Sequence, residues 1–530
     1  MIRPHTLTVD QLDELAGGYG SAGTHRLLAA TQKSKRMLML LALDEAADPG
    51  VRRAERFDEA LALFARAQAA APAAADEVLH DPFFGVWTAD AIRAPARCLR
   101  LFAAYAAAAA ARAGLAFRIE VPVRHGLLTL PGIGTFGGLE GDSAVVEGGP
   151  DGLRAGPVRA AAPPTEEGPG WAPLRRLGAG IALEDADPHR DCFDWPPSAR
   201  LDGPAAEGLR RSVEGALDLL DEHHPAHAAG IRATLRSLVP VTAPGGGNVS
   251  AASRWAFGAI AIEAGGGPAD LALSLIHECR HMTLGAVLDL VDLYEAGGPA
   301  RHFAPWRADP RTVSALLQGT YAHAGVTDFW RVERRRTGAA AAEFEFAYWL
   351  AQTSAGARSL LASGELTPRG VRFVTRLAET LRGWRSEAVR GDVLAAATAS
   401  ALAVGVQWRL DNAHPDPGGV DRLAAAWRGG ADCPAPPSVL IRPAPARPAR
   451  VPAVADRARR LVVGEDRLAP GEGDGGGEPG ADVWLRLALA AGSGPLVEHP
   501  EVVRAVSRAT GADPLRLADW ITSGAARYRS

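Results

Sequence analysis

Apolar residues recur every three or four positions along much of the first 115 residues. "THRLLAATQKSKRMLMLLALDEA" and "RAERFDEALALFARAQAAAP" both show this spacing, which places the apolar side chains on one face of an α-helix. After residue 115 the pattern changes to short β-type runs broken by Gly and Pro, such as "FRIEVPVRHGLLTLPGIGTF" and "SAVVEGG". The sequence therefore predicts an N-terminal helical region over residues 1–115 and a small β-rich region over 116–182.

Helical spacing returns after residue 183 and continues to about residue 428, interrupted by "RWAFGAIAIEA", which predicts a strand. We take 183–428 as one catalytic region. The stretch 429–482 is rich in Pro and Gly and predicts a linker, and 483–530 predicts a small helical tail. The expected fold class is mainly α with a small β-rich segment (α+β), built around a helical core that holds a metal site.

Charge and cysteine content narrow the cellular setting. The formal net charge of the 530 residues is −4 and no basic block is present, which argues against nucleic acid or an anionic membrane as a partner. The four cysteines include no CxxC pair, and the N-terminus lacks the pattern of a secretion signal. We therefore expect a soluble protein of a reducing cytoplasm, with its oligomeric state left open.

The strongest chemical signal is the HExxH motif in "LALSLIHECRHMTLGAVLDL". On a helix whose start Asp270 can cap, the imidazoles of His277 and His281 lie one turn apart and project toward a shared point, the usual arrangement of two metal ligands. Glu278 leans toward the same point, where it can orient a metal-bound water or accept its proton. The alternative is an exposed helix with two solvated histidines.

Two histidines do not hold a metal firmly, so a third ligand is expected. Apolar Val287 and Leu288 exclude the extended HExxHxxGxxH pattern. Downstream candidates are Glu295, His302, His323, Glu343 and Glu345. His323 is preferred because a helix capped by Asp309, with Pro310 in its first turn, places it on one face with Leu316, Gly319 and Val326. The alternative is a buried histidine satisfied by a backbone carbonyl, with a distant Glu as the ligand of a zinc enzyme.

Two arginines, Arg307 and Arg311, lie close to this second helix in the sequence. A guanidinium binds a carboxylate through two parallel hydrogen bonds, so a small diacid near the metal has a cationic partner here. An iron oxygenase that uses 2-oxoglutarate needs such a partner, and a zinc peptidase does not. The alternative is that Arg311 pairs with a local acid and Arg307 is solvated.

Five stretches together resemble a known family. "SRWAFGAIAIEA", "LIHECRHMTLGAVLDLVDLYE", "FAPWRADPR", "LLQGTYAHAGVTDFWR" and "VQWRLDN" occur in an order similar to that of the HExxH-motif peptide-modification family of bacteria. Its members are described as 2-oxoglutarate-dependent β-hydroxylases of ribosomally made precursor peptides. The resemblance covers residues 1 to about 430, and the last hundred residues lie outside it.

The resemblance implies Fe(II) and 2-oxoglutarate as cofactors, with dioxygen and a precursor peptide as substrates. His277, His281 and His323 would be the iron ligands, and Arg307 or Arg311 would hold 2-oxoglutarate. The chain departs from the family at Gln318, where a histidine is common. A triad of histidines also differs from the usual two histidines and one carboxylate, which leaves Glu278 as a possible ligand instead of a base. The other functions considered are a zinc metallopeptidase, with Glu278 as general base, and a non-catalytic peptide-binding scaffold.

Overall fold

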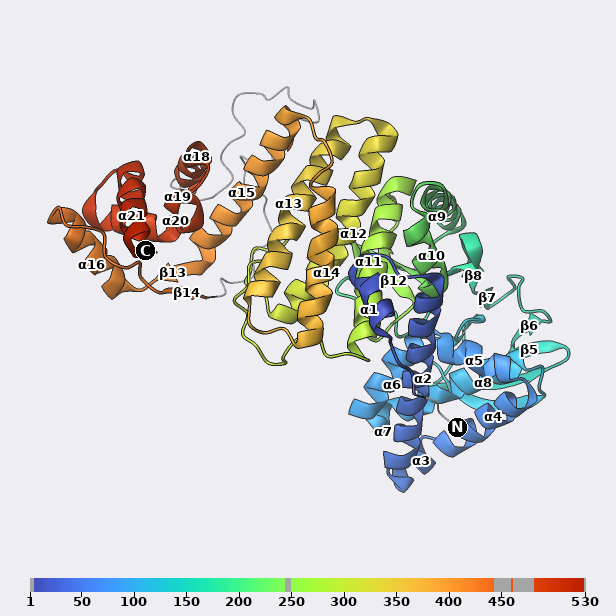
Figure 1. Cartoon of the computed structure of the whole chain (residues 1–530). Helices are drawn as coiled ribbons and strands as arrows, with labels where there is room; N and C mark the ends of the chain where they lie inside the picture. Colours follow the sequence, from blue (N-terminus) through green and yellow to red (C-terminus); the bar gives the residue numbers. More distant parts are fainter. Residues whose placement is uncertain (1–3, 244–248, 443–458, 461–480, 529–530) are drawn as a thin grey trace. The chain divides into compact units, whose positions relative to one another are not determined.

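Helices account for 59% of the described residues and strands for 13%, which confirms the expected class of a mainly α protein with a small β part (Figure 1). This computed structural model describes residues 4–243, 249–442, 459–460 and 481–528. The chain divides into two compact units. The N-terminal unit comprises Met1–Glu14 and Tyr19–Leu290, and the C-terminal unit comprises Leu15–Gly18 and Val291–Ser530. This division falls inside the region 183–428 that the sequence analysis treats as one.

The first part of the N-terminal unit is helical, as its spacing predicts. Ser21, Asp48 and Asp81 cap three of these helices with side-chain oxygens that accept backbone N–H groups. The helices are α1 (Val9–Ala16), α2 (Ala22–Ala46), α3 (Pro49–Ala54), α4 (Phe57–Ala70), α5 (Pro72–His80), α6 (Pro82–Arg93), α7 (Pro95–Cys98), a 3₁₀ turn η1 (Leu99–Leu101), and α8 (Phe102–Arg112).

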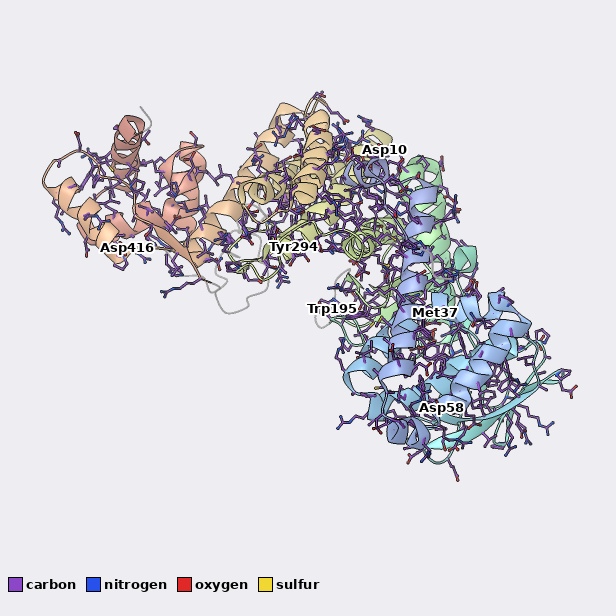
Figure 2. The ribbon with its side chains drawn as sticks, turned by 60° about the horizontal axis from the view of Figure 1, so that its bottom comes forward. Asp10, Met37, Asp58, Trp195, Tyr294 and Asp416 are labelled. Carbon is purple, nitrogen blue, oxygen red and sulfur yellow. The ribbon has the colours of Figure 1, made fainter. Side chains whose placement is uncertain are left out.

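An aromatic cluster forms the core of these helices. The rings of Trp87 and Phe102 stack with centroids 5.2 Å apart, and Phe84 meets Tyr105 edge to face at 5.0 Å. Met37, labelled in Figure 2, packs partly buried against the same core. The Ala-rich helix α8 is almost wholly buried here, so the run of alanines lets neighbouring elements approach it closely.

Three sheets complete the N-terminal unit. A four-stranded antiparallel sheet has the order β1-β4-β5-β6, and a three-stranded sheet has the order β2-β3-β7. The third sheet, β11-β12-β10-β9-β8, mixes parallel and antiparallel pairs and has β11 at one edge. The strands are β1 (Phe117–Pro122), β2 (Leu127–Leu130), β3 (Gly134–Gly137), β4 (Ser143–Gly149), β5 (Gly152–Ala155), β6 (Val158–Ala161), β7 (Trp171–Pro173), β8 (Arg175–Arg176), β9 (Ala182–Leu183), β10 (Ser237–Val241), β11 (Ser250–Ala252) and β12 (Ala259–Glu263).

The helices that accompany this third sheet are η2 (Gly178–Gly180), α9 (Gly203–His223), α10 (Pro225–Thr234) and α11 (Pro268–Leu288). Helix α11 carries the HExxH motif and packs against α9, α2 and the edge strand β11. Its cap is Gly267, and Pro268 occupies the first turn. The expected cap at Asp270 is therefore wrong, because Pro268 is preorganised for the first helical turn and the cap lies three residues earlier, at Gly267. Asp270 lies within that turn.

The C-terminal unit is built from long helices followed by a smaller helical cluster. Its elements are α12 (Val313–Thr337), α13 (Ala340–Ala362), α14 (Pro368–Trp384), α15 (Gly391–Asn412), β13 (Ala413–Pro415), α16 (Pro417–Arg428), β14 (Val439–Ile441), α18 (Ala481–Ala491), α19 (Pro495–Glu498), α20 (Pro500–Thr510) and α21 (Pro514–Tyr528). The last helices share a core with the second half of α15. Most of the predicted linker 429–482 lies outside the described residues.

One described helix is long and apolar enough to cross a membrane by length and composition. It is α15, whose most apolar window is 39% buried. The core helix of a soluble protein passes the same test, so a single helix of this kind is weak evidence for a membrane span. The buried residues Ala403, Val406 and Leu410 of α15 belong to the core of the C-terminal helices, which gives its apolar composition a role in packing.

Candidate metal site

The two histidines of the motif meet on α11 as their spacing predicts. Their Nε2 atoms lie 3.2 Å apart, and their ring planes are inclined by 77°. Two imidazole nitrogens bound to one ion at about 2.1 Å, in tetrahedral or octahedral geometry, are about 3.0–3.4 Å apart. Both rings are half-buried, on the less covered face of the helix. The separation and exposure of His277 and His281 therefore suit two ligands of one metal ion.

Glu278 points away from solvent, toward the edge strand β11. Its side chain is buried, and its Oε1 accepts a 2.7 Å hydrogen bond from the Ser250 hydroxyl. The backbone N–H of Ala252 also donates to it. Burial raises the pKa of Glu278 above the ordinary value, while the charge of His281 and the two hydrogen bonds oppose that shift. These contacts join the motif helix to the sheet and fix the orientation of the carboxylate.

Replacing Ser250 with alanine is expected to lower the free energy of unfolding by about 1–2 kcal/mol, because a buried carboxylate loses one of its donors. Denaturant unfolding of the full chain measures this change. The matched control is Ser198→Ala, since the Ser198 hydroxyl makes only an exposed bond to Thr242, and its expected effect is within about 0.5 kcal/mol. Equal stability of the two variants would show that the Ser250 bond contributes nothing.

His323 is buried within the C-terminal unit between two tryptophan rings. Trp306 stacks on it at 4.2 Å with planes 12° apart, and the Trp349 ring lies 4.7 Å away. The ring Nδ1 lies 2.8 Å from the carbonyl of Gly319. Because a carbonyl only accepts, this bond places a proton on Nδ1, which makes Nε2 the ring nitrogen that a metal would use. The same bond is also the one expected under the alternative prediction, in which His323 is a buried histidine paired with a backbone carbonyl.

Gly319 leaves the room that this stacking needs. A Cβ at this position would lie 2.3 Å from the Trp306 ring. Helix α12 itself begins after Thr312, whose hydroxyl accepts the N–H of Ala315 at 3.3 Å. The expected cap at Asp309 is wrong, because that carboxylate is engaged by the neighbouring arginines.

Gly319→Ala is expected to push Trp306 off His323 and to destabilise the C-terminal unit by about 1–3 kcal/mol, the usual cost of an overfilled core. Tryptophan fluorescence during denaturant unfolding reports both effects. Gly383→Ala on α14 is the control, because a Cβ there meets no atom within 4 Å, and an open helix position favours alanine. If both variants unfold alike, Gly319 does not hold space for the ring.

Arg307 and Arg311 both bind Asp309, each at 2.9 Å. Burial raises the pKa of Asp309, but the bonds from the two guanidinium groups outweigh it and the pKa is lowered. Two positive charges and one negative charge leave this cluster with a net charge of +1. Arg311 therefore pairs with a local acid, Asp309, as the alternative prediction for this residue stated. Since the Arg307 and Arg311 side chains remain 50% and 34% exposed, both can still take up an added carboxylate.

Three other candidate ligands are engaged elsewhere in the C-terminal unit. His302 bonds Glu365 at 3.0 Å, Glu343 binds Arg390 at 2.7 Å, and Glu345 accepts the Trp349 indole N–H at 3.0 Å. Among the described residues, no group of three or more His, Cys, Asp or Glu side chains could hold a metal ion. The pair on α11 thus accounts for two ligands. His323 belongs to the other compact unit, and its convergence with the pair stays a prediction.

The roles of Ser250 and of the two tryptophans around His323 do not follow from the sequence. Ser250 is 28 residues from Glu278, and no local pattern joins them. Trp306 lies in "FAPWRADPR", where the arginines are the residues with evident binding chemistry.

Comparison of the chain with protein-family models finds no match, and comparison with curated proteins finds no significant match.

Proposed function

We propose that the chain is an Fe(II)- and 2-oxoglutarate-dependent dioxygenase that β-hydroxylates residues of a ribosomally synthesised precursor peptide in the bacterial cytoplasm. The observation that carries the metal part of this proposal is the 3.2 Å separation of the His277 and His281 Nε2 atoms. The reaction class rests on the sequence resemblance described above. The arginine cluster, with its net charge of +1, supports a carboxylate-bearing co-substrate.

In this proposal His277, His281 and His323 hold the iron, and Arg307 and Arg311 hold the distal carboxylate of 2-oxoglutarate. When bound, the iron with 2-oxoglutarate and dioxygen supplies the oxidising power that converts a C–H bond into C–OH. The protein positions the groups around it. Ser250 and the Ala252 N–H hold Glu278 in place, and the two tryptophans restrict water around His323 and fix its ring.

The test uses the purified full chain, loaded with Fe(II) without oxygen and then supplied with 2-oxoglutarate, air and the peptide encoded next to its gene. Succinate and a mass gain of one oxygen on the peptide are the expected products. A His277→Ala sample treated in the same way is the control. Succinate and peptide mass equal to those of the control would refute the hydroxylase.

A zinc metallopeptidase is the second candidate, and the environment of Glu278 favours it. A buried carboxylate of raised pKa that is held by two donors suits a general base. This candidate predicts bound zinc in the purified protein and peptide cleavage that Glu278→Gln abolishes. Elemental analysis together with peptide mass spectrometry separates the two functions, because the hydroxylase leaves the peptide backbone intact.

A further inference from the structure

One cavity in the N-terminal unit is lined by residues other than His277 and His281. Its volume is about 260 Å³, smaller than the roughly 300–1,000 Å³ of sites for drug-sized ligands. Its walls come from the α5–α6 junction, the end of α8, the segment from β8 to β9, and the start of β10. A ligand that fills it is therefore a small molecule.

Acidic and basic side chains line this cavity without pairing with each other. The lining residues with charge are Glu77, Asp81, Arg112, Arg176, Glu184, Arg232 and Arg236. Arg232 is neutralised by Asp221, so three guanidinium groups face three carboxyl groups. Among the described residues, none of these six groups makes an ion pair with an N···O distance of 4.0 Å or less. Opposite charges that share a cavity but stay apart leave room for a group between them.

Two of the three acids, Asp81 and Glu184, are held in place by backbone donors. Asp81 accepts the N–H of Phe83 at 2.9 Å, and Glu184 accepts the N–H of Asp187 at 2.9 Å. Burial raises the pKa of both, and the nearby charge of Asp81 adds to the rise for Glu184, to about 7. A positively charged ligand group next to these two carboxylates would offset the free-energy cost of burying their charged forms.

Two of the three arginines, Arg112 and Arg176, are positioned by carbonyl groups. Arg112 donates to the Pro131 carbonyl at 3.1 Å, and Arg176 donates to the Gly180 carbonyl at 3.0 Å. Gly132 has a φ of +67°, and a Cβ there would lie 2.3 Å from Nη2 of Arg112, so a side chain at this position would displace the guanidinium. These contacts fix the two cations, and no described carboxylate lies within 4.0 Å of either one.

A hydroxyl group in the wall points independently to a ligand. Ser237 is 3% exposed and lines the cavity, and its Oγ has no hydrogen-bond partner among the described residues. A buried hydroxyl without a partner costs free energy. A compact metal ion does not explain the site, since no group of described acids and histidines is gathered closely enough to hold one. An organic ligand with several polar atoms spans the larger distances.

We propose that this cavity binds a small zwitterion of the chemistry of a free α-amino acid, its ammonium group held by Asp81 and Glu184 and its carboxylate by Arg112, Arg176 and Arg236. The Ser237 hydroxyl adds a hydrogen bond to the ligand. This site is independent of the histidine pair and does not depend on the function proposed for it.

Calorimetric titration of the full chain with each of the standard L-amino acids tests the proposal. At least one is expected to bind, and its N-acetyl and carboxamide derivatives, which each lack one charge, are expected to bind at least about tenfold more weakly. Inorganic phosphate is the probe for a simple anion site. Binding of no amino acid would overturn the proposal, as would equal binding of the singly charged derivatives or of phosphate.

Variants locate the binding in this cavity. Glu184→Gln and Arg236→Gln are each expected to weaken the bound amino acid at least about tenfold, and Arg232→Gln, in the same wall but already paired, by less than about twofold. Thermal melting of each variant confirms folding, and Glu184→Gln keeps an oxygen for the Asp187 N–H. If folded Glu184→Gln and Arg236→Gln bind as tightly as the unaltered chain, the ligand lies elsewhere and the assignment is wrong.

Discussion

Replacing His277 with alanine is expected to weaken metal binding by more than about a hundredfold and to remove succinate formation. Outer-sphere changes alone typically cost about 10–100-fold in metal affinity, and this change removes a ligand itself. The remaining His281 imidazole would hold the ion with one nitrogen on α11 in place of two, 3.2 Å apart. Elemental analysis of the purified variant measures the bound metal, and succinate assays measure the activity.

The control for this experiment is His414→Ala, which removes an exposed histidine in β13. Loss of that side chain should leave metal content and succinate unchanged. His323→Ala separates the predicted third ligand from the pair, because it should retain weak metal binding through His277 and His281. Wild-type metal content in the His277→Ala protein would mean that the motif pair is not the metal site.

The fold class follows from the sequence because it depends on periodicity, which is local. Runs such as residues 57–70 keep apolar residues on one helical face, and the seven residues "SAVVEGG" form strand β4. The convergence of His277 and His281 was predictable for the same reason, since one helical turn fixes it. Helix starts were less predictable, because several good capping residues compete within a few positions and tertiary contacts choose among them.

Contacts between distant segments were not predictable. The bond between Ser250 and Glu278 depends on β11 reaching α11 through the sheet, and the tryptophans meet His323 through the packing of α12, α13 and a loop. From the sequence alone, Arg307 and Arg311 could either bind an added anion or pair with Asp309, which lies between them in the chain. The structure places Asp309 between them, and the charge left over is what an added carboxylate can use.

The last hundred residues, which the resemblance does not cover, are joined to α15 by a buried ion pair. Arg409 donates to Glu501 in the first turn of α20 at 2.9 Å, and the Glu501 side chain is 0% exposed. Arg409→Ala is expected to destabilise helices α18–α21 by up to about 3–5 kcal/mol, because the buried carboxylate loses its guanidinium and keeps only the half-exposed His499 ring as a partner. Hydrogen exchange of peptides from these helices, together with denaturant unfolding, measures the loss.

The pH dependence of this variant follows from the same pair. Burial raises the pKa of Glu501, but the bonds from His499 and Arg409 outweigh it, and the pKa lies below the ordinary value of 4.5. The stabilisation by the pair is therefore complete above about pH 4.5 and is lost as the pH falls through the lowered pKa. Arg409→Ala should accordingly differ most from the unaltered chain near neutral pH, and least in acid.

Two further variants separate the buried charge from simple loss of a side chain. Arg428→Ala removes an exposed bond to the Ala509 carbonyl in the same cluster and should cost less than about 1 kcal/mol. Adding Glu501→Gln to Arg409→Ala removes the unpaired charge and should recover much of the lost stability. If the double variant is no more stable than Arg409→Ala, the cost comes from packing of the arginine stem against α20, and the ion pair does not anchor the C-terminal helices.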